Sequence, residues 1–454
     1  MAIACMDAER IVGYFRGKSI LITGSTGFLG QILVEKILRV QPDANKLYLL
    51  VRGTEASSAA SDWHRAVRPA EGEARRRVPA VDPRQSCCSA RRHHLREPGA
   101  AGGSRCSCRS PRVTYVCGDR EGLILEKPIE SLREGTYLNV DAELQLVKEA
   151  KKNLTTMNTS SDGDDAAHSN KKTAERKAMK ELGLQRARHF GWSNTYVFTK
   201  AMGEMVLGQL RGDMPVVVMR PSIITSVRAD PLPGWMQGIR TIDTLIIGYA
   251  KQNLSCFLGD LSVVVDVIPG DMAVNAMMAA MVEHSEEKGG AAAVVPVYHA
   301  TSSLRNPATY SVLYEAGRRH FYENPRVGKN GEIIPTREMC FFSSIARFHL
   351  YMLLTFKLPL EILHLVNLLL CGHFSRLYND LNRKYKFVMH LVHVYGPFAF
   401  FNGRFDDMNL ERLRLKMAMK TPEDHMFIFD PKTIDWDDYF TKIHIPGVLK
   451  YLCK

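Results

Sequence analysis

Hydrophobic and polar positions follow a regular order over the first fifty residues. Ser19 to Thr23 (SILIT) is a short apolar run, typical of a buried parallel strand. From Phe28 to Leu38 the apolar residues recur at helical spacing, and Lys46 to Val51 (KLYLLV) forms a second apolar run. This succession of strand, helix and strand predicts a βαβ unit at the start of a parallel sheet.

The pattern stops after Arg52. Residues 55–112 are rich in Arg, Ala, Ser, Pro, Gly and Cys, and they show no period of 2 or 3.6. A compact domain seldom holds so long a loop, so the simplest interpretation is a disordered insertion. We favour an aberrant low-complexity segment, such as the translation of a wrong frame or a retained intron. A doubly wound sheet needs its third and fourth strands here, and no candidate strand occurs.

Periodic segments return after this stretch. They predict strands at Val113–Val116, Pro215–Met219 and Val263–Ile268, helices at Val140–Lys151, Ala174–Ala187 and Tyr196–Leu210, and a polar loop at Asn153–Lys172. The predicted fold is α/β, with a doubly wound, Rossmann-like parallel sheet formed by residues 1–54 and 113–330. A smaller, mainly helical C-terminal domain is predicted for residues 345–454.

One C-terminal segment, Phe348 to Cys371, is strongly apolar, but Lys357, Glu361 and other polar residues interrupt it. A membrane-spanning helix needs about 20 nearly uninterrupted apolar residues. The interruptions therefore favour a buried core hairpin or an interfacial membrane helix over a transmembrane helix.

Charge and cysteine content exclude several classes of function. The formal net charge is +12, but residues 55–112 hold twelve arginines against six acids and so supply half of it. Without a zinc-finger spacing or an aromatic RNA-binding motif, we predict no nucleic-acid binding. The ten cysteines form no paired CxxC framework, which predicts reduced thiols and no metal site. The N-terminus lacks an apolar signal core, so a location facing the cytosol is expected.

A glycine-rich turn joins the first predicted strand to the first helix. Glycines in this context permit a tight turn and let the backbone approach a pyrophosphate, which the helix N-terminus then binds. The spacing is GxxGxxG, and it predicts a dinucleotide-binding turn made of Thr23, Gly24, Ser25, Thr26, Gly27, Phe28, Leu29 and Gly30.

Arg52 follows the second strand directly. An acid at this strand end would accept hydrogen bonds from the ribose of NAD, whereas a cation suits the 2′-phosphate of NADP. The ordinary alternative is a solvated surface arginine. We predict NADPH as the cofactor.

Tyr196 and Lys200 lie four residues apart, on one face of a predicted helix. A nearby ammonium stabilises the phenolate and lowers the pKa of a tyrosine. Tyr196 is therefore predicted to hand a proton to a developing alkoxide, while Lys200 also holds the nicotinamide ribose. The YxxxK pattern is common by chance in amphipathic helices, but together with the glycine turn it predicts a reductase.

Further segments resemble the plant fatty acyl-CoA reductases, extended short-chain dehydrogenases with a C-terminal male-sterility domain. The resemblance covers about residues 8–54 and 113–454. It is carried by Val116-Cys117-Gly118-Asp119-Arg120-Glu121-Gly122, Gly191-Trp192-Ser193-Asn194-Thr195-Tyr196-Val197-Phe198-Thr199-Lys200, Met219-Arg220-Pro221-Ser222-Ile223-Ile224, Pro233-Gly234-Trp235, Asp266-Val267-Ile268-Pro269, Tyr298-His299, Arg305-Asn306-Pro307, Gly403-Arg404-Phe405-Asp406, Asp435-Trp436-Asp437-Asp438-Tyr439-Phe440 and His444-Ile445-Pro446-Gly447.

The resemblance implies that NADPH reduces a long-chain or very-long-chain fatty acyl-CoA to a primary alcohol. The first hydride gives a hemithioacetal that loses CoA, and the resulting aldehyde takes a second hydride. It also implies peripheral association with the cytosolic face of the endoplasmic reticulum membrane, the alternative being a cytoplasmic enzyme. Whether the alcohol enters wax, suberin or the pollen wall stays open.

One motif departs from the family. The family places a Ser-Thr pair just before the tyrosine at a strand end, and this chain has Pro111-Arg112-Val113-Thr114 there. Thr114 lies one residue after the position of the family's threonine, and adjacent side chains on a strand point to opposite faces. A catalytically impaired remnant of such a reductase is therefore the alternative to an active enzyme. A nucleotide-sugar epimerase is a third hypothesis, which the C-terminal segments disfavour.

Other polar residues have ordinary interpretations. His299, His393 and His444 are predicted to be packing or surface residues. Arg305 and the pair Arg404 and Asp406 are predicted to form a structural hydrogen-bond network.

Overall fold

The computed structural model describes residues 6–50, 114–118, 120–129, 137–156, 165–286, 295–327, 330–396, 398–417 and 422–453. Five strand pairs in these ranges are parallel: β1 (Ser19–Thr23) with β2 (Lys46–Leu50), β4 (Val218–Pro221) with β8 (Val297–Ala300), β5 (Ile223–Thr225) with β7 (Val267–Pro269), β11 (Cys340–Phe342) with β6 (Cys256–Leu258), and β12 (Gly403–Phe405) with β3 (Gly122–Ile124). β9 (Arg326–Val327) and β10 (Ile333–Ile334) pair antiparallel. The predicted α/β class with Rossmann-like parallel strands is confirmed.

The first βαβ unit forms as predicted. β1 pairs in register with β2, and α2 (Phe28–Val40) connects them. The first strand, predicted to be buried, is buried on one face only, because Ile20 and Ile22 are buried while Leu21 is 55% exposed. α1 (Ala8–Phe15), α2 and α8 (Gly270–Glu283) pack together on the face of β1 that carries Ile20 and Ile22.

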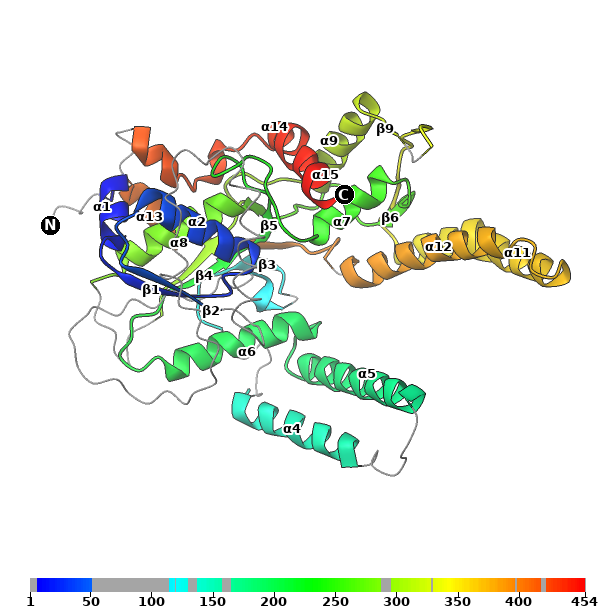
Figure 1. Cartoon of the computed structure of the whole chain (residues 1–454), viewed down its shortest axis with the longest axis horizontal. Helices are drawn as coiled ribbons and strands as arrows, with labels where there is room; N and C mark the ends of the chain where they lie inside the picture. The colour runs from blue at the N-terminus through cyan, green and yellow to red at the C-terminus, as the bar shows by residue number, and fades with distance from the viewer. Residues whose placement is uncertain are drawn as a thin grey trace.

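α6 (Thr195–Leu210) lies on the other side of the strands from α2 (Figure 1). It packs against α4 (Val140–Thr156) and α5 (Asp165–His189). The polar loop predicted from Asn153 to Lys172 is therefore wrong at both ends, and residues 157–164 lie outside the described ranges. The two helices are joined by an ion pair between Arg186 and Glu143, whose nearest atoms are 2.5 Å apart.

The strand predicted at Val113–Val116 is wrong over its described residues. Thr114–Cys117 form a turn of 3-10 helix, and Val113 lies outside the described ranges. The carbonyl of Val116 accepts a hydrogen bond from the indole Nε1 of Trp192 at 2.8 Å. This backbone acceptor is therefore bonded to a side chain and not to a neighbouring strand.

The C-terminal part is mainly helical and begins with a long hairpin. α10 (Ile345–Met352), η2 (Leu353–Lys357) and α11 (Leu358–Leu369) run on as one helix, and α12 (Ser375–Tyr395) returns beside α11. The α11–α12 hairpin projects away from the rest of the molecule (Figure 1). The continuous helix Ile345–Leu369 is long and apolar enough to cross a membrane, by length and composition only, and 17% of its most apolar 18-residue stretch is buried. The predicted buried core hairpin is therefore wrong.

The last fifty residues pack back onto the body. β12 pairs with β3, and α13 (Met408–Lys416) packs on β8 and α8. η3 (Pro422–Phe427) contacts α8, and η4 (Pro431–Thr433) leads to α14 (Trp436–Asp438). η5 (Tyr439–His444) and α15 (Ile445–Leu452) then pack on α9 (Tyr310–Glu323) and α7 (Thr241–Ala250).

Candidate active site

The predicted glycine turn lies at the carboxyl end of β1. Gly24 has a φ of +71°, which favours glycine, and its carbonyl accepts a hydrogen bond from the amide of Gly27 at 2.9 Å. A Cβ on Gly30 would lie 2.3 Å from the Gly24 carbonyl oxygen. The turn therefore closes tightly because Gly30 has no side chain.

The N-terminus of α2 suits a diphosphate. Gly27 is its N-cap residue and supplies no side-chain hydrogen bond, and the first turn contains no acidic residue. The first amide groups of a helix have no partner within the helix, and they carry the positive end of the helix dipole. The residues present here therefore fit the pyrophosphate of a dinucleotide.

Tyr196 and Lys200 lie together at the N-terminal end of α6. Asn194 caps this helix, since its Oδ1 accepts a hydrogen bond from the amide of Val197 at 3.0 Å. Tyr196 is 59% exposed, and the Nζ of Lys200 lies 5.6 Å from the centre of its ring. Burial raises the pKa of Tyr196 above its ordinary value, the opposite direction from the one that we predicted. The lysine is beside the ring but does not dominate the ionisation of the phenol.

A buried ion pair, which we did not predict, anchors the same helix. Glu204 lies one turn beyond Lys200, and its carboxylate receives two hydrogen bonds from the guanidinium of Arg220 in β4, at 2.5 and 3.2 Å. Arg220 also bonds the Nε2 of His299 at 3.1 Å. Tyr196, Lys200 and Glu204 follow one another at a spacing of four, which places all three on one face of the helix. This spacing could have marked Glu204, but it does not reveal that its partner lies on β4.

Beside this pair, Glu126 ties the C-terminal part to the sheet. Its carboxylate accepts hydrogen bonds from the backbone amides of His299 at 2.7 Å and Asn409 at 2.5 Å. Burial raises the pKa of Glu126 to about 7, and it lowers the pKa of His299 to about 3 with help from the charge of Arg220. His299 is therefore a neutral, buried packing residue, as predicted.

Several predicted features lie outside the described residues. These are Arg52, the segment 55–112, and Pro111, Arg112 and Val113 at the position of the family's Ser-Thr pair. The structure also describes only the backbone of Thr114. The preference of Arg52 for the 2′-phosphate of NADP and the gap in the Ser-Thr motif therefore remain predictions.

Most of the remaining polar residues have the structural roles predicted for them. His444 is fully buried and His393 is exposed. Arg305 pairs with Asp407 at 3.0 Å, and Arg404 donates to the carbonyl of Ser303 at 3.1 Å. Within the described ranges, no group of three or more His, Cys, Asp or Glu residues could hold a metal ion.

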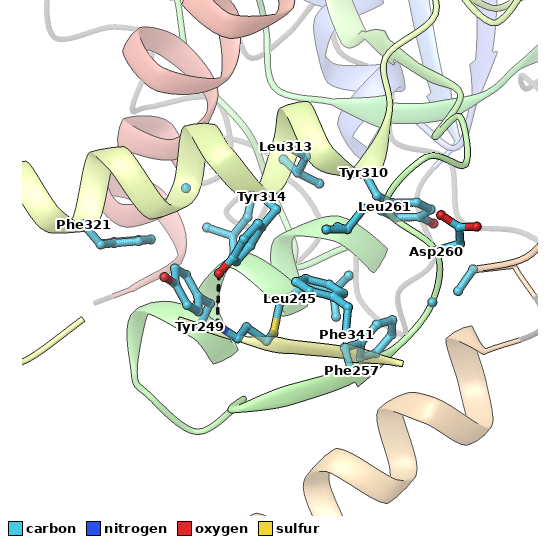
Figure 2. A pocket seen from close by; sticks show the side chains of 15 residues that line it. Leu245, Tyr249, Phe257, Asp260, Leu261, Tyr310, Leu313, Tyr314, Phe321 and Phe341 are labelled. Atoms are coloured by element: carbon cyan, nitrogen blue, oxygen red, sulfur yellow. Dashed lines mark hydrogen bonds between the residues drawn. The ribbon is translucent and has the colours of Figure 1, made fainter. Parts of the chain in front are cut away.

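An apolar pocket lies between α7, α9 and the β6–β11 pair. The empty space between its lining residues is about 620 Å³, and this includes open solvent at its mouth. Figure 2 shows Tyr249, Leu313 and Phe321 around it, with Asp260 at one end. The hydroxyl of Tyr314 accepts a hydrogen bond from the amide of Met339 at 3.0 Å. Neither the glycine turn nor the pair Tyr196 and Lys200 lines this pocket, so it is a separate apolar compartment.

The α11–α12 hairpin exposes apolar and basic side chains together. Asn367 closes its tip, because its Oδ1 accepts a hydrogen bond from the amide of Phe374 at 2.8 Å and its carbonyl accepts one from Gly372 at 2.7 Å. One face of η2 and α11 carries a row of exposed aliphatic side chains, namely Leu354, Leu358, Ile362, Leu365 and Leu369. α12 carries the exposed cations Arg376, Arg383, Lys384 and Lys386.

Comparisons with known proteins give matches over nearly the whole chain. Two family models described as "Male sterility protein" match, an NAD-binding one at residues 22–82 and 114–277 and a second one at residues 355–454. "Fatty acyl-CoA reductase 1" of Arabidopsis thaliana is 36% identical over 502 aligned positions, covering 98% of this chain and 99% of that protein. "Alcohol-forming fatty acyl-CoA reductase" of Simmondsia chinensis is 37% identical, covering 97% and 98%. A solved terminal reductase domain of the myxalamid pathway matches with a TM-score of 0.46, at 14% identity over 99% of this chain and 96% of its own.

Proposed function

The chain belongs to the fatty acyl-CoA reductase family, and we propose that it reduces a long-chain fatty acyl-CoA to the primary alcohol with NADPH. The observation that carries the proposal is the pairing of two local arrangements. A helix with an uncapped N-terminus follows the glycine turn, and a second helix begins with a tyrosine and a lysine one turn apart. This combination supports hydride transfer to a carbonyl, with the proton supplied by the protein.

The reaction needs a proton at the carbonyl oxygen in each of two reductions. When bound, the nicotinamide cofactor supplies the hydride. Tyr196 donates its phenolic proton to the oxygen of the thioester carbon, which gives the hemithioacetal; this loses the CoA thiol and becomes the aldehyde. A second hydride and a second proton give the alcohol. A tyrosine with its ordinary pKa of about 10 is already protonated at neutral pH, and burial raises the pKa of Tyr196 further, so the phenol holds a proton to donate. Lys200 holds positive charge beside the ring as negative charge develops.

The cofactor form in this proposal is NADPH. Its support is Arg52, two residues beyond the end of β2, where the ribose of a dinucleotide bound at the glycine turn is expected. Replacement of Arg52 by Asp should lower the preference for NADPH over NADH in binding titrations.

In this proposal the acyl tail lies in the apolar pocket. α7 starts beside the glycine turn, where the guanidinium of its N-cap residue Arg240 stacks on Phe28, and its later residues Leu245 and Tyr249 line the pocket. Tyr249 is the ninth residue after Arg240 along this helix, which corresponds to a rise of about 14 Å. The pocket is therefore within one short helix of the predicted diphosphate site.

The hairpin docks on the membrane in this proposal. Residues 345–395 hold six Lys or Arg against two Asp or Glu, and a row of leucines is exposed beside them. Apolar side chains flanked by cations favour the interface of an anionic bilayer. A water-insoluble substrate and product make the cytosolic face of the endoplasmic reticulum the proposed location.

The test is product formation by the purified chain with lipid vesicles, NADPH and acyl-CoA of 16 to about 30 carbons. Fatty alcohol should form, and Tyr196→Phe should lower kcat by roughly 10²–10⁴-fold because the proton donor is lost. Tyr137→Phe changes an 81% exposed tyrosine that lies beside the C-terminal half of α6, away from Tyr196. It is the matched control and should leave the rate unchanged. Alcohol formation at the wild-type rate by Tyr196→Phe would refute the assignment.

A second candidate function is a cofactor-binding protein without turnover. It is favoured by the family match, which omits residues 83–113, directly before Thr114. This protein would bind NADPH with ordinary affinity and form neither aldehyde nor alcohol. A chain with the segment before Thr114 replaced by the family's Ser-Thr motif should then gain activity.

A further inference from the structure

Arg240 lies against the glycine turn and was not among the predicted cofactor residues. Its guanidinium carbon is 4.4 Å from the centre of the Phe28 ring, and Phe28 is the first residue of α2. A planar cation stacked on an aromatic ring is held in a fixed orientation. Positive charge therefore stands next to the uncapped start of this helix.

The loop that carries Arg240 is firmly held. The buried carboxylate of Asp271 accepts hydrogen bonds from the amides of Arg228, Ala229 and Asp230, at 2.8–3.3 Å. Further along the loop, the ring of Trp235 packs edge-on against Phe28 with centroids 5.5 Å apart. The position of Arg240 thus follows from packing at both ends of the loop and is not that of a free surface side chain.

The charge of Arg240 is poorly compensated by the residues around it. One terminal nitrogen donates to the carbonyl of Gln237 at 2.8 Å, but the other, Nη1, is buried with no hydrogen-bond partner among the described residues. Asp243 bonds the backbone of Arg240, since its Oδ2 accepts from the amide at 2.9 Å, and its charge acts on the guanidinium without a hydrogen bond between the two side chains. The other carboxylate oxygen, Oδ1, faces the Nε2 of His444 at 3.3 Å.

Such a cation has an incomplete environment. A buried N–H of a charged group without a partner is costly, and within the described ranges no carboxylate lies within ion-pair distance of this guanidinium. Arg240 as a whole is partly exposed, so a ligand can still reach the side chain. An anion at the start of α2 would complete the hydrogen bonding of the arginine and of the helix amides together.

We infer that Arg240 binds a diphosphate oxygen of the dinucleotide, opposite the amides of the glycine turn. This inference rests on the proposed function, because it places the cofactor at that turn. The group that Arg240 binds is a diphosphate, and both the dinucleotide and the CoA of the substrate contain one. The dinucleotide is the assigned source, since the ring beneath Arg240 belongs to the helix that follows the glycine turn.

The test is direct titration of the full-length chain with NADPH, NADH and acyl-CoA, followed by calorimetry or cofactor fluorescence. Arg240→Gln should weaken NADPH binding by about tenfold or more, the usual effect of losing a charged hydrogen bond. The loss should be of equal size for NADH, because the diphosphate is common to both cofactors. Arg240→Lys keeps the charge without the planar fork and should give a smaller loss. Melting temperatures of the apoprotein show whether each variant folds.

Arg228→Gln is the matched control. Arg228 lies on the same loop, but its guanidinium donates to the side chain and the carbonyl of Thr433. Its substitution should leave NADPH affinity unchanged.

Two results would overturn the role of Arg240 alone: unchanged NADPH affinity in Arg240→Gln, or a loss confined to acyl-CoA. A wild-type chain that binds no NADPH would instead overturn the proposed function itself. The two failures are therefore distinguishable.

Discussion

The exposed face of α11 offers a quantitative test of membrane docking. Leu365 is 60% exposed and Leu369 is 82% exposed, on the same side of the helix. Full burial of a leucine side chain is worth about 1.5–3 kcal/mol. Scaled by these exposed fractions, the two side chains together contribute about 2–4 kcal/mol if the membrane covers them. The variant Leu365→Gln/Leu369→Gln should therefore bind vesicles about 30- to 1000-fold more weakly.

The assay is co-sedimentation of the purified chain with vesicles of neutral or anionic lipid. The matched control is Leu210→Gln/Leu415→Gln, which removes two leucines that are 75% and 78% exposed but lie outside the hairpin. This control should bind like the wild type. Neither variant should change the melting temperature much, because the altered side chains already face solvent.

Charge and apolar contact can be separated in the same assay. Arg383→Gln/Lys384→Gln removes two exposed cations of α12 and should weaken binding to anionic vesicles only, in a salt-sensitive manner. Equal vesicle binding by the wild type and by Leu365→Gln/Leu369→Gln would refute the argument. So would an equal loss in the Leu210→Gln/Leu415→Gln control.

Three further predictions concern the pocket, the glycine turn and Glu126. Gly317 lines the pocket, and a Cβ added there meets nothing within 4 Å. Gly317→Leu should fill the space and lower kcat/KM for the longest acyl-CoA by at least about tenfold relative to shorter ones. Gly13→Leu, at an exposed position of α1, should not. Gly30→Ala places a Cβ 2.3 Å from the Gly24 carbonyl oxygen, so the turn must open. Titration with NADPH should then show at least about tenfold weaker binding. Binding of NADPH with wild-type affinity would contradict the assignment of this turn to the cofactor. The pKa of Glu126 is raised to about 7 from its ordinary 4.5, so the folded chain keeps a proton that the unfolded chain releases between these pH values. The free energy of unfolding should therefore fall by at most about 3 kcal/mol as pH rises through this window. Glu126→Gln should flatten the decline in melting temperature between pH 5 and 8, and an unchanged slope would exclude Glu126 as its source.

The parts of the site that depend on short-range spacing could be predicted from sequence. The glycine turn needs only strand, glycines and helix in succession, and the pair Tyr196 and Lys200 needs only one helical turn. Both arrangements are local, so periodicity and cap residues determine them. The same holds for the bounds of α2 and α6, which differ by at most two residues from the prediction.

The parts that depend on distant contacts could not be predicted. Glu204 and His299 meet only because Arg220 lies between them on β4, and nothing in their local sequence selects that partner. β12 pairs with β3 although almost 280 residues separate them. The α11–α12 hairpin shows a second limit of prediction from sequence. An apolar helix has the same composition whether it is buried or exposed, so composition could not decide between the two. Thr114–Cys117 form a 3-10 turn in place of the predicted strand, and the Val116 carbonyl accepts a hydrogen bond from Trp192, a distant partner that the local sequence does not indicate.

The end of the chain takes part in shaping the cofactor side of the molecule. Tyr439 donates its hydroxyl proton to Thr225 Oγ1 at 2.7 Å, and the Nδ1 of His444 lies 3.0 Å from the Oγ of Ser226. A Cβ on Gly447 would lie 2.2 Å from the Gly234 carbonyl oxygen, so here two backbones touch without side chains between them. These contacts hold the start and the middle of the loop that ends at Arg240 beside Phe28. The two regions matched by separate family models are therefore one packed unit, and the geometry at the glycine turn depends on the last residues of the chain.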